Sequence, residues 1–133
     1  MIIGISPDRL ASTWHKIEPL LKKAFAVVDY PLTLLDVLNA VQKSEMQLWM
    51  THDAKMAWMT QIVVYPRYKV FLIISGGGEG IEDWLQEADS LFTAFASHHG
   101  CKYVEIQGRR GWVRVGEPLG YTPIYTTIRK EVA

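Results

Sequence analysis

The sequence predicts a single α+β domain, with a mixed, mostly antiparallel central sheet flanked by helices. Three observations lead to this prediction. Apolar residues at helical spacing fill the first part of the chain, strand-like runs with short connectors follow, and a glycine-rich segment then leads into another helical pattern. The 133 residues are enough for one hydrophobic core, and no linker or repeat divides residues 1–133.

One strand and two helices are expected in the N-terminal part. A short strand at Ile2–Ser6 leads into a helix with Pro7 at its first position, where the missing N–H costs nothing. This helix is predicted to reach about Phe25, with an interruption at Pro19. After Pro31, leucines and a valine spaced by three residues predict a second helix.

Three strands are predicted in the middle of the chain. Their ranges are Met46–Met50, Met56–Tyr65 and Lys69–Ser75. The connectors between them are short, and short connectors join antiparallel neighbours.

The C-terminal part is expected to add a long helix and two strands. Apolar residues from Ile81 to Phe95 share one helical face, and Gly100 stands where a helix C-cap is expected. A strand at Cys101–Gln107, a short helix or irregular turn over 109–120 and a last strand over 122–132 follow. The strand–helix–strand unit around the glycines is expected to be a right-handed crossover between parallel strands.

The segment FLIISGGGEGIEDWL, from Phe71 to Leu85, carries four glycines in five positions. A strand that ends in glycines and opens into a helix offers free N–H groups and a positive helix end to a phosphate. It is not a P-loop, because Ile81 and Glu82 replace the required Lys and Ser or Thr, and the antiparallel context does not fit a dinucleotide fold. From the residues alone, a ligand-free corner that lets the helix fold back is the favoured interpretation.

The element order resembles the GNAT acetyltransferase superfamily over nearly the whole chain. In that family the loop after the fourth strand carries Gln/Arg-x-x-Gly-x-Gly/Ala. The segment SGGGEG matches at Gly78 and Gly80, while Ser75 stands in place of Gln or Arg. The chain is also similar to small GNAT-like proteins of tailed phages, some of which lie among the virion genes of T7-like phages. The residues behind this second resemblance are Leu48-Trp49, Ile62, Tyr65-Pro66-Arg67, Trp84-Leu85, EIQGRRGW and Gly120-Tyr121.

The resemblance implies acetyl-CoA as cofactor, with no metal, in a cleft where the strand Lys69–Ser75 splays from Cys101–Gln107. Arg109, Arg110 and Arg114 surround Trp112 and are suited to bind phosphate, although a solvated cluster is an open alternative. The cofactor-binding residues implied are Ile73, Ile74, Ser75, Gly76, Gly77, Gly78, Gly80 and Arg109.

Two features depart from the family pattern. Glu79, Glu82 and Asp83 crowd the predicted helix start and would repel a pyrophosphate. Gly116 occupies the place where many GNAT enzymes have a tyrosine acid. Both features would weaken binding or catalysis.

Glu105 and Tyr121 are the catalytic candidates. A general base in this family lies near the middle of the split sheet, and Glu105 falls there within an alternating strand. Tyr121 is a candidate to replace the missing acid. A solvent-facing Glu105 and a Tyr121 that packs in the core remain open alternatives.

Charge and cysteine content narrow the functional classes. The 14 basic and 14 acidic residues give no net charge, which argues against a non-specific nucleic-acid binder. A single cysteine, Cys101, cannot form an intrachain disulfide, and His98 and His99 lack the spacing of a metal motif.

The sequence therefore leaves two alternative functions open. The first is acetyl-CoA-dependent acetylation of an unidentified small-molecule or protein amine. The alternative is a catalytically inactive GNAT-fold phage protein that serves as a minor virion component or binds a host factor. The sequence shows no signal peptide or membrane span, so we expect a cytoplasmic protein, in the host cytoplasm if phage-encoded, or one associated with virions.

Overall fold

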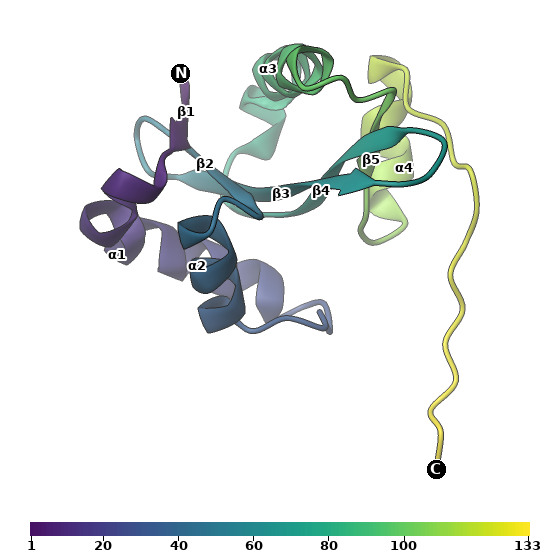
Figure 1. The fold of residues 1–133 in the computed structure, drawn as a ribbon, viewed down its shortest axis with the longest axis horizontal. Coiled ribbons are helices and arrows are strands. Elements are labelled where there is room, and N and C mark those ends of the chain that lie inside the picture. Colours follow the sequence, from purple (N-terminus) through teal and green to yellow (C-terminus); the bar gives the residue numbers. More distant parts are fainter.

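A five-stranded sheet, in the order β1-β2-β3-β4-β5, separates two helical layers in the computed structural model, which describes all residues from Met1 to Ala133 (Figure 1). The first four strands are antiparallel neighbours, and β5 pairs in parallel with β4. The strands are β1 (Ile2–Ile5), β2 (Gln47–Thr51), β3 (Met56–Val64), β4 (Lys69–Gly78) and β5 (Tyr103–Ile106). The predicted mixed, mostly antiparallel sheet is confirmed.

Helices cover both faces of the sheet. Figure 1 shows α1 (Pro7–Phe25) and α2 (Leu34–Gln42) on one face, and α3 (Leu85–His98) on the other. We call these the α1 face and the α3 face. The short helix α4 (Gly111–Gly116) lies beside β5, and 3₁₀ turns η1 (Ile81–Asp83) and η2 (Glu117–Leu119) precede α3 and follow α4.

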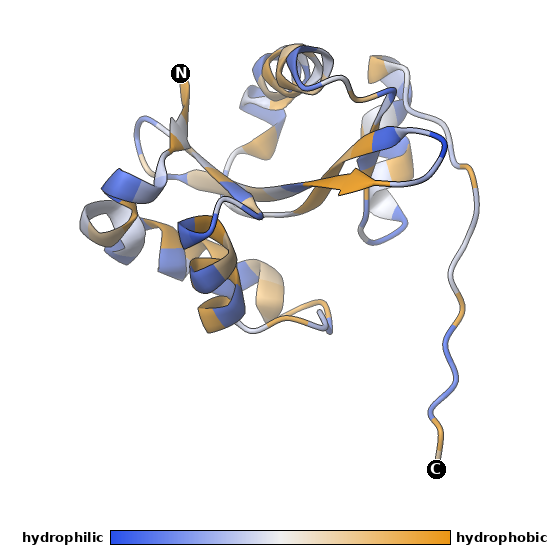
Figure 2. Ribbon diagram, in the orientation of Figure 1, coloured by the Kyte–Doolittle hydropathy of each residue, from blue (hydrophilic) through white to orange (hydrophobic).

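Each face has its own hydrophobic core. On the α1 face, Leu10, Ile17 and Val37 are fully buried. On the α3 face, Phe71 from β4 and Phe92 from α3 are buried between the helix and the sheet. In Figure 2 the strands are largely apolar while each helix mixes apolar and hydrophilic segments, which is typical of helices that bury one side. None of the helices combines the length and apolarity needed to span a bilayer.

The predicted interruption of the first helix at Pro19 is wrong, because α1 continues through it to Phe25. Pro19 lies on the exposed side of the helix, so water can satisfy the carbonyl that loses its hydrogen bond. The neighbouring Ile17, Leu20 and Leu21 are buried, and their packing holds the helix together.

The prediction that β4 ends at Ser75 and that a glycine loop follows is also wrong. Strand β4 extends through Gly76 and Gly77 to Gly78, and these three residues pair with β3. Only Gly80 lies in a connecting turn, with a left-handed φ of 73°.

The predicted last strand over 122–132 is not formed. Residues 122–133, which we call the C-terminal arm, contain no helix or strand. No strand of this chain lies alongside them, and Figure 1 shows the arm leaving the body next to α4 and running past the edge of the sheet. A strand needs a partner for its backbone groups, and the arm has none within the chain.

Candidate functional site

Strands β4 and β5 separate part of the way along. Their parallel pairing runs from Val70–Tyr103 to Ile73–Ile106, and the N–H of Gln107 still donates to the carbonyl of Ile73 at 3.0 Å. Beyond that point β4 continues to Gly78 without a neighbour on this side. We call this opening the β4–β5 gap. The two strands expected to splay are paired over most of their predicted length, and only the end of β4 beyond Ile73 lacks β5 as a neighbour.

A β-bulge in β4 lies at the start of the gap. Met59 pairs with Ser75 and Thr60 pairs with Ile73, so Ile74 is an extra residue on β4. Bulges increase the local twist and redirect side chains. Here the bulge lies where the pairing of β4 with β5 ends.

The glycines of β4 have clear structural roles. A Cβ on Gly77 would overlap the carbonyl oxygen of Leu20, so glycine allows α1 to lie directly on the strand. Gly78 has a φ of 129°, and a Cβ there would overlap the carbonyl oxygen of Lys55. These two glycines are needed by the fold whether or not a ligand binds.

An apolar pocket opens on the α3 face of the gap. Its cavity volume is about 40 Å³, and its walls include Trp58 and Ile73 from the sheet and Phe92 from α3. Four of the residues predicted from the sequence line it together: Ile73, Ser75, Gly76 and Tyr121.

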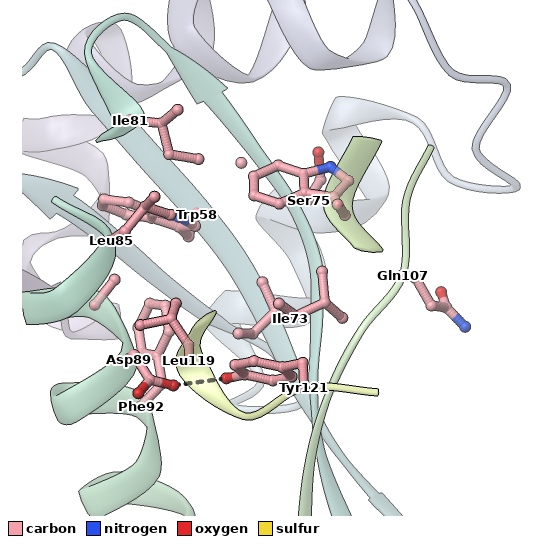
Figure 3. Close-up of a pocket in the computed structure, with 14 residues that line it drawn as sticks. Trp58, Ile73, Ser75, Ile81, Leu85, Asp89, Phe92, Gln107, Leu119 and Tyr121 are labelled. Carbon is pink, nitrogen blue, oxygen red and sulfur yellow. Dashed lines mark hydrogen bonds between the residues drawn. The ribbon is translucent and has the colours of Figure 1, made fainter. Parts of the chain in front are cut away.

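Tyr121 points across this pocket toward α3 (Figure 3). Its hydroxyl donates a hydrogen bond of 2.9 Å to Oδ1 of Asp89. Burial raises the pKa of the Tyr121 hydroxyl well above its usual value, and the hydrogen bond to Asp89 and the Asp89 charge raise it further. The phenol therefore keeps its proton, directed at a carboxylate.

The place of Tyr121 depends on Gly116. The N–H of Tyr121 donates to the carbonyl of Gly116 at 3.1 Å, and a Cβ on Gly116 would lie 3.0 Å from Cβ of Tyr121. Tyr121 thus follows η2 and packs on α4.

The other predicted residues lie outside this pocket. Ile74 belongs to the core of the α1 face, and Gly77 faces α1 as described above. Glu105 is half-buried and pairs with Leu72, which packs on the α1 face, so Glu105 and Tyr121 lie on opposite sides of the sheet. Arg109 is exposed just before α4.

A second, polar hollow surrounds the turn after β4. It is lined by Asp53, Lys55, Glu79, Gly80, Asp83 and Trp84. Three of these side chains are acidic and one is basic, and we call this region the acidic turn. Nζ of Lys23 lies 3.4 Å from Oε1 of Glu79 and offsets part of the negative charge.

Sequence reasoning missed several residues at the gap. The hydroxyl of Tyr30, from the α1–α2 connection, donates a 2.7 Å hydrogen bond to Oγ of Ser75. Asp89 holds Tyr121 and was not predicted either. Trp112, which the sequence did single out, packs so closely on Gly108 that a Cβ there would overlap its ring. Tyr30 stands 45 positions from Ser75 and carries no motif, so no local pattern could have linked the two.

No group of three or more His, Cys, Asp or Glu side chains is placed to hold a metal ion.

The sequence matches no protein-family model and no curated protein. Its fold, however, is similar to solved acetyltransferases over almost their whole length. A ribosomal-protein-alanine N-acetyltransferase from Brucella melitensis biovar Abortus 2308 is 10% identical, with a TM-score of 0.73 and 99% of each chain covered. An aminoglycoside acetyltransferase from an uncultured soil metagenomic sample, solved in complex with sisomicin, is 10% identical with a TM-score of 0.69, covering 100% of this chain and 95% of that one.

The chain has a GNAT-like fold. A Trypanosoma brucei acetyltransferase extends the similarity, at 14% identity, a TM-score of 0.65 and 99% coverage of both chains. At these identities the likeness concerns the GNAT fold alone. The chemistry has to be argued from the residues at the gap.

Proposed function

We propose that this protein binds acetyl-CoA in the β4–β5 gap and transfers the acetyl group to an amine. The observation that carries the proposal is the separation of the two strands beyond Ile73, which exposes a strand edge beside an apolar pocket. Two similar structures, the ribosomal-protein-alanine and the aminoglycoside acetyltransferases, are described as enzymes with amine-bearing substrates, which supports an amine acceptor.

The gap suits the pantetheine part of the cofactor. Pantetheine alternates amides with short apolar segments, and the unpaired edge of β4 offers backbone partners beside apolar walls. Ile73, Ile74, Ser75 and Gly76 would hold this part. The cavity of about 40 Å³ has room for only a few waters, so a lining side chain has to move on binding.

The residues suit the diphosphate less well. Gly78 and Gly80 bracket the turn where backbone N–H groups would meet it, and the exposed Arg109, just before α4, would reach the phosphates. Glu79 and Asp83 oppose this with negative charge at the same turn. We therefore expect acetyl-CoA to bind weakly.

When bound, acetyl-CoA supplies an acyl group activated as a thioester. An amine that enters from the α1 face would meet Glu105, whose carboxylate would accept the proton that the amine loses on attack. Tyr121 faces the other side of the sheet and is bound to Asp89, so we assign it to holding the pocket wall rather than to donating a proton.

The proposal is tested by titrating acetyl-CoA into the protein by calorimetry and by following the mass of candidate amines. Leu119→Trp places bulk at the half-buried rim of the pocket and should abolish binding. Val113→Trp is the matched control, because Val113 is 47% exposed and does not line the pocket. Equal binding by both variants would show that acetyl-CoA occupies another place.

A second arm of the test addresses transfer. Glu105→Gln keeps the shape of the side chain and should slow acetylation about 100-fold or more with unchanged cofactor affinity, the size expected for loss of a general base. Saturable binding without any acetylated amine would favour the non-catalytic alternative. No binding at all by the native protein would overturn the proposal.

A further inference from the structure

The C-terminal arm exposes large apolar side chains to water. Ile124 is 64% exposed, Tyr125 is 72% exposed, and Ile128 and Val132 are each 91% exposed. No backbone hydrogen bond joins residues 122–133 to the rest of the chain. Apolar side chains gathered on so short a segment are typical of a surface that is covered by a partner.

The arm has the composition of a strand. It is rich in β-branched and aromatic residues, among them Ile124, Tyr125, Thr126, Thr127 and Ile128. In extended form Ile124, Thr126 and Ile128 point to one side, and Tyr125, Thr127 and Arg129 point to the other.

The sheet offers one suitable edge for such a strand. At the β1 edge, the N–H of Ile2 already donates to Oε2 of Glu87 at 2.6 Å. At the other edge, no strand pairs with the outer side of β5. Unpaired edge strands accept strands from other chains.

The arm does not lie along its own β5. It follows Tyr121, which is bound to Asp89 on the α3 face, and Nη1 of its Arg129 lies 2.9 Å from Oδ2 of Asp29 in the α1–α2 connection on the opposite face. The arm therefore crosses the edge of the sheet instead of following it, as Figure 1 shows. The ion pair is largely exposed on both sides, and such pairs hold a segment only weakly.

We infer that the arm of one copy adds as a strand to β5 of a second copy, and that the exchange is reciprocal. Every copy carries both an arm without a partner and a β5 edge without a partner. In a closed, two-fold symmetric dimer the arm of each copy pairs with the β5 edge of the other, so that no arm or edge is left unpaired. This inference does not depend on acetyl-CoA binding.

The side chains of the two strands match. Val104 and Ile106 pack toward the core of the α3 face, so pairing is favoured when Ile124, Thr126 and Ile128 join that face. The same alternation places Arg129 of the arm on the side of Glu105, where the opposite charges attract.

The reach of the arm is sufficient. Its extended length is about 40 Å at ~3.3 Å per residue, whereas pairing with β5 takes up only about 13 Å. The remainder can span the distance between two copies.

The inference is tested by the mass of the protein in solution, measured by light scattering after size-exclusion chromatography. We expect the native protein to be a dimer, and Ile128→Asp to weaken the dimer at least tenfold. Ile128 is 91% exposed in the single chain, so its replacement does not disturb folding of the monomer. Leu35→Asp is the control, since Leu35 is 63% exposed on α2, away from β5, and its replacement should leave the dimer intact.

Cross-linking distinguishes exchange from other arrangements. With Cys101→Ser as background, Glu105→Cys combined with Arg129→Cys should give a covalent dimer on a non-reducing denaturing gel, and Leu35→Cys combined with Arg129→Cys should not. A disulfide within one chain would show that the arm folds onto its own β5 and would overturn the inference. A native protein that stays monomeric at all concentrations, or an Ile128→Asp variant that remains dimeric, would also overturn it.

Discussion

The hydroxyl of Tyr30 donates a 2.7 Å hydrogen bond to the hydroxyl of Ser75. Ser75 follows the bulge residue Ile74 on β4, and only 6% of it is exposed. This contact ties the connection between α1 and α2 to the unpaired end of β4. It is the only hydrogen bond formed by either of these side chains.

Removing the Tyr30 hydroxyl should therefore destabilise the protein. In Tyr30→Phe the buried Ser75 hydroxyl loses its partner, which costs about 1–2 kcal/mol of unfolding free energy. Urea denaturation measures the change. Tyr65→Phe serves as control, because Tyr65 is 48% exposed and its hydroxyl makes no hydrogen bond to the protein, so a similar loss there would refute the role of the Tyr30 contact.

Gly77→Ala tests the close approach of α1 to β4. The new Cβ would overlap the carbonyl oxygen of Leu20, and neither backbone can move without disturbing a core, so we predict a loss of about 1–3 kcal/mol or more. Gly111→Ala has no atom within 4 Å of its new Cβ and should change stability by less than about 0.5 kcal/mol. Thermal unfolding of the two variants makes the comparison, and equal melting temperatures would show that α1 can shift.

Asp83→Asn tests the acidic turn. Removing one negative charge beside Gly80 should raise the affinity for acetyl-CoA about twofold to tenfold, and the gain should shrink as salt is added. Asp8→Asn makes the same charge change in the first turn of α1, remote from the turn, and should leave the affinity unchanged. If both substitutions act equally, total charge rather than the acidic turn limits binding.

The raised pKa of Tyr121 predicts a loss of stability at high pH. Because the folded state holds this proton more tightly than the unfolded state, the contribution is complete below the unfolded pKa of ~10 and declines as the pH rises above it. Unfolding free energies at several pH values from ~9 upward should fall more steeply for the native protein than for Tyr121→Phe. Parallel curves would show that Tyr121 does not contribute.

The same Tyr121→Phe variant separates a structural role from catalysis. We predict that it acetylates an amine substrate at nearly the native rate, because the hydroxyl is directed at Asp89. A large fall in turnover with unchanged cofactor affinity would identify Tyr121 as the acid of the reaction.

The sequence predicted the sheet well because its signals are local. Alternating apolar runs and short connectors were enough to place β2, β3 and β4 within one to three residues, and Gly100 ends α3 with a left-handed φ of 73° as expected. The helix start after the glycines was less accurate, since η1 precedes α3.

The errors came from contacts that no local pattern contains. Gly76–Gly78 were expected to form a loop, but all three pair with β3, and α1 lies directly on Gly77. The arm over 122–132 has a strand-like composition and no partner within the chain. The pairs Tyr30–Ser75 and Tyr121–Asp89 join distant segments, and they were not predicted for the same reason.

The contact between Gly77 and Leu20 brings two backbones together with no side chain between them. Side chains can change rotamer and absorb a displacement, but two touching backbones transmit it. The free end of β4 and helix α1 are therefore mechanically coupled. A ligand that pushes this end of the strand toward α1 must also displace the helix. A ligand bound in the gap would then change the position of the solvent-facing side of α1, on the far surface of the molecule.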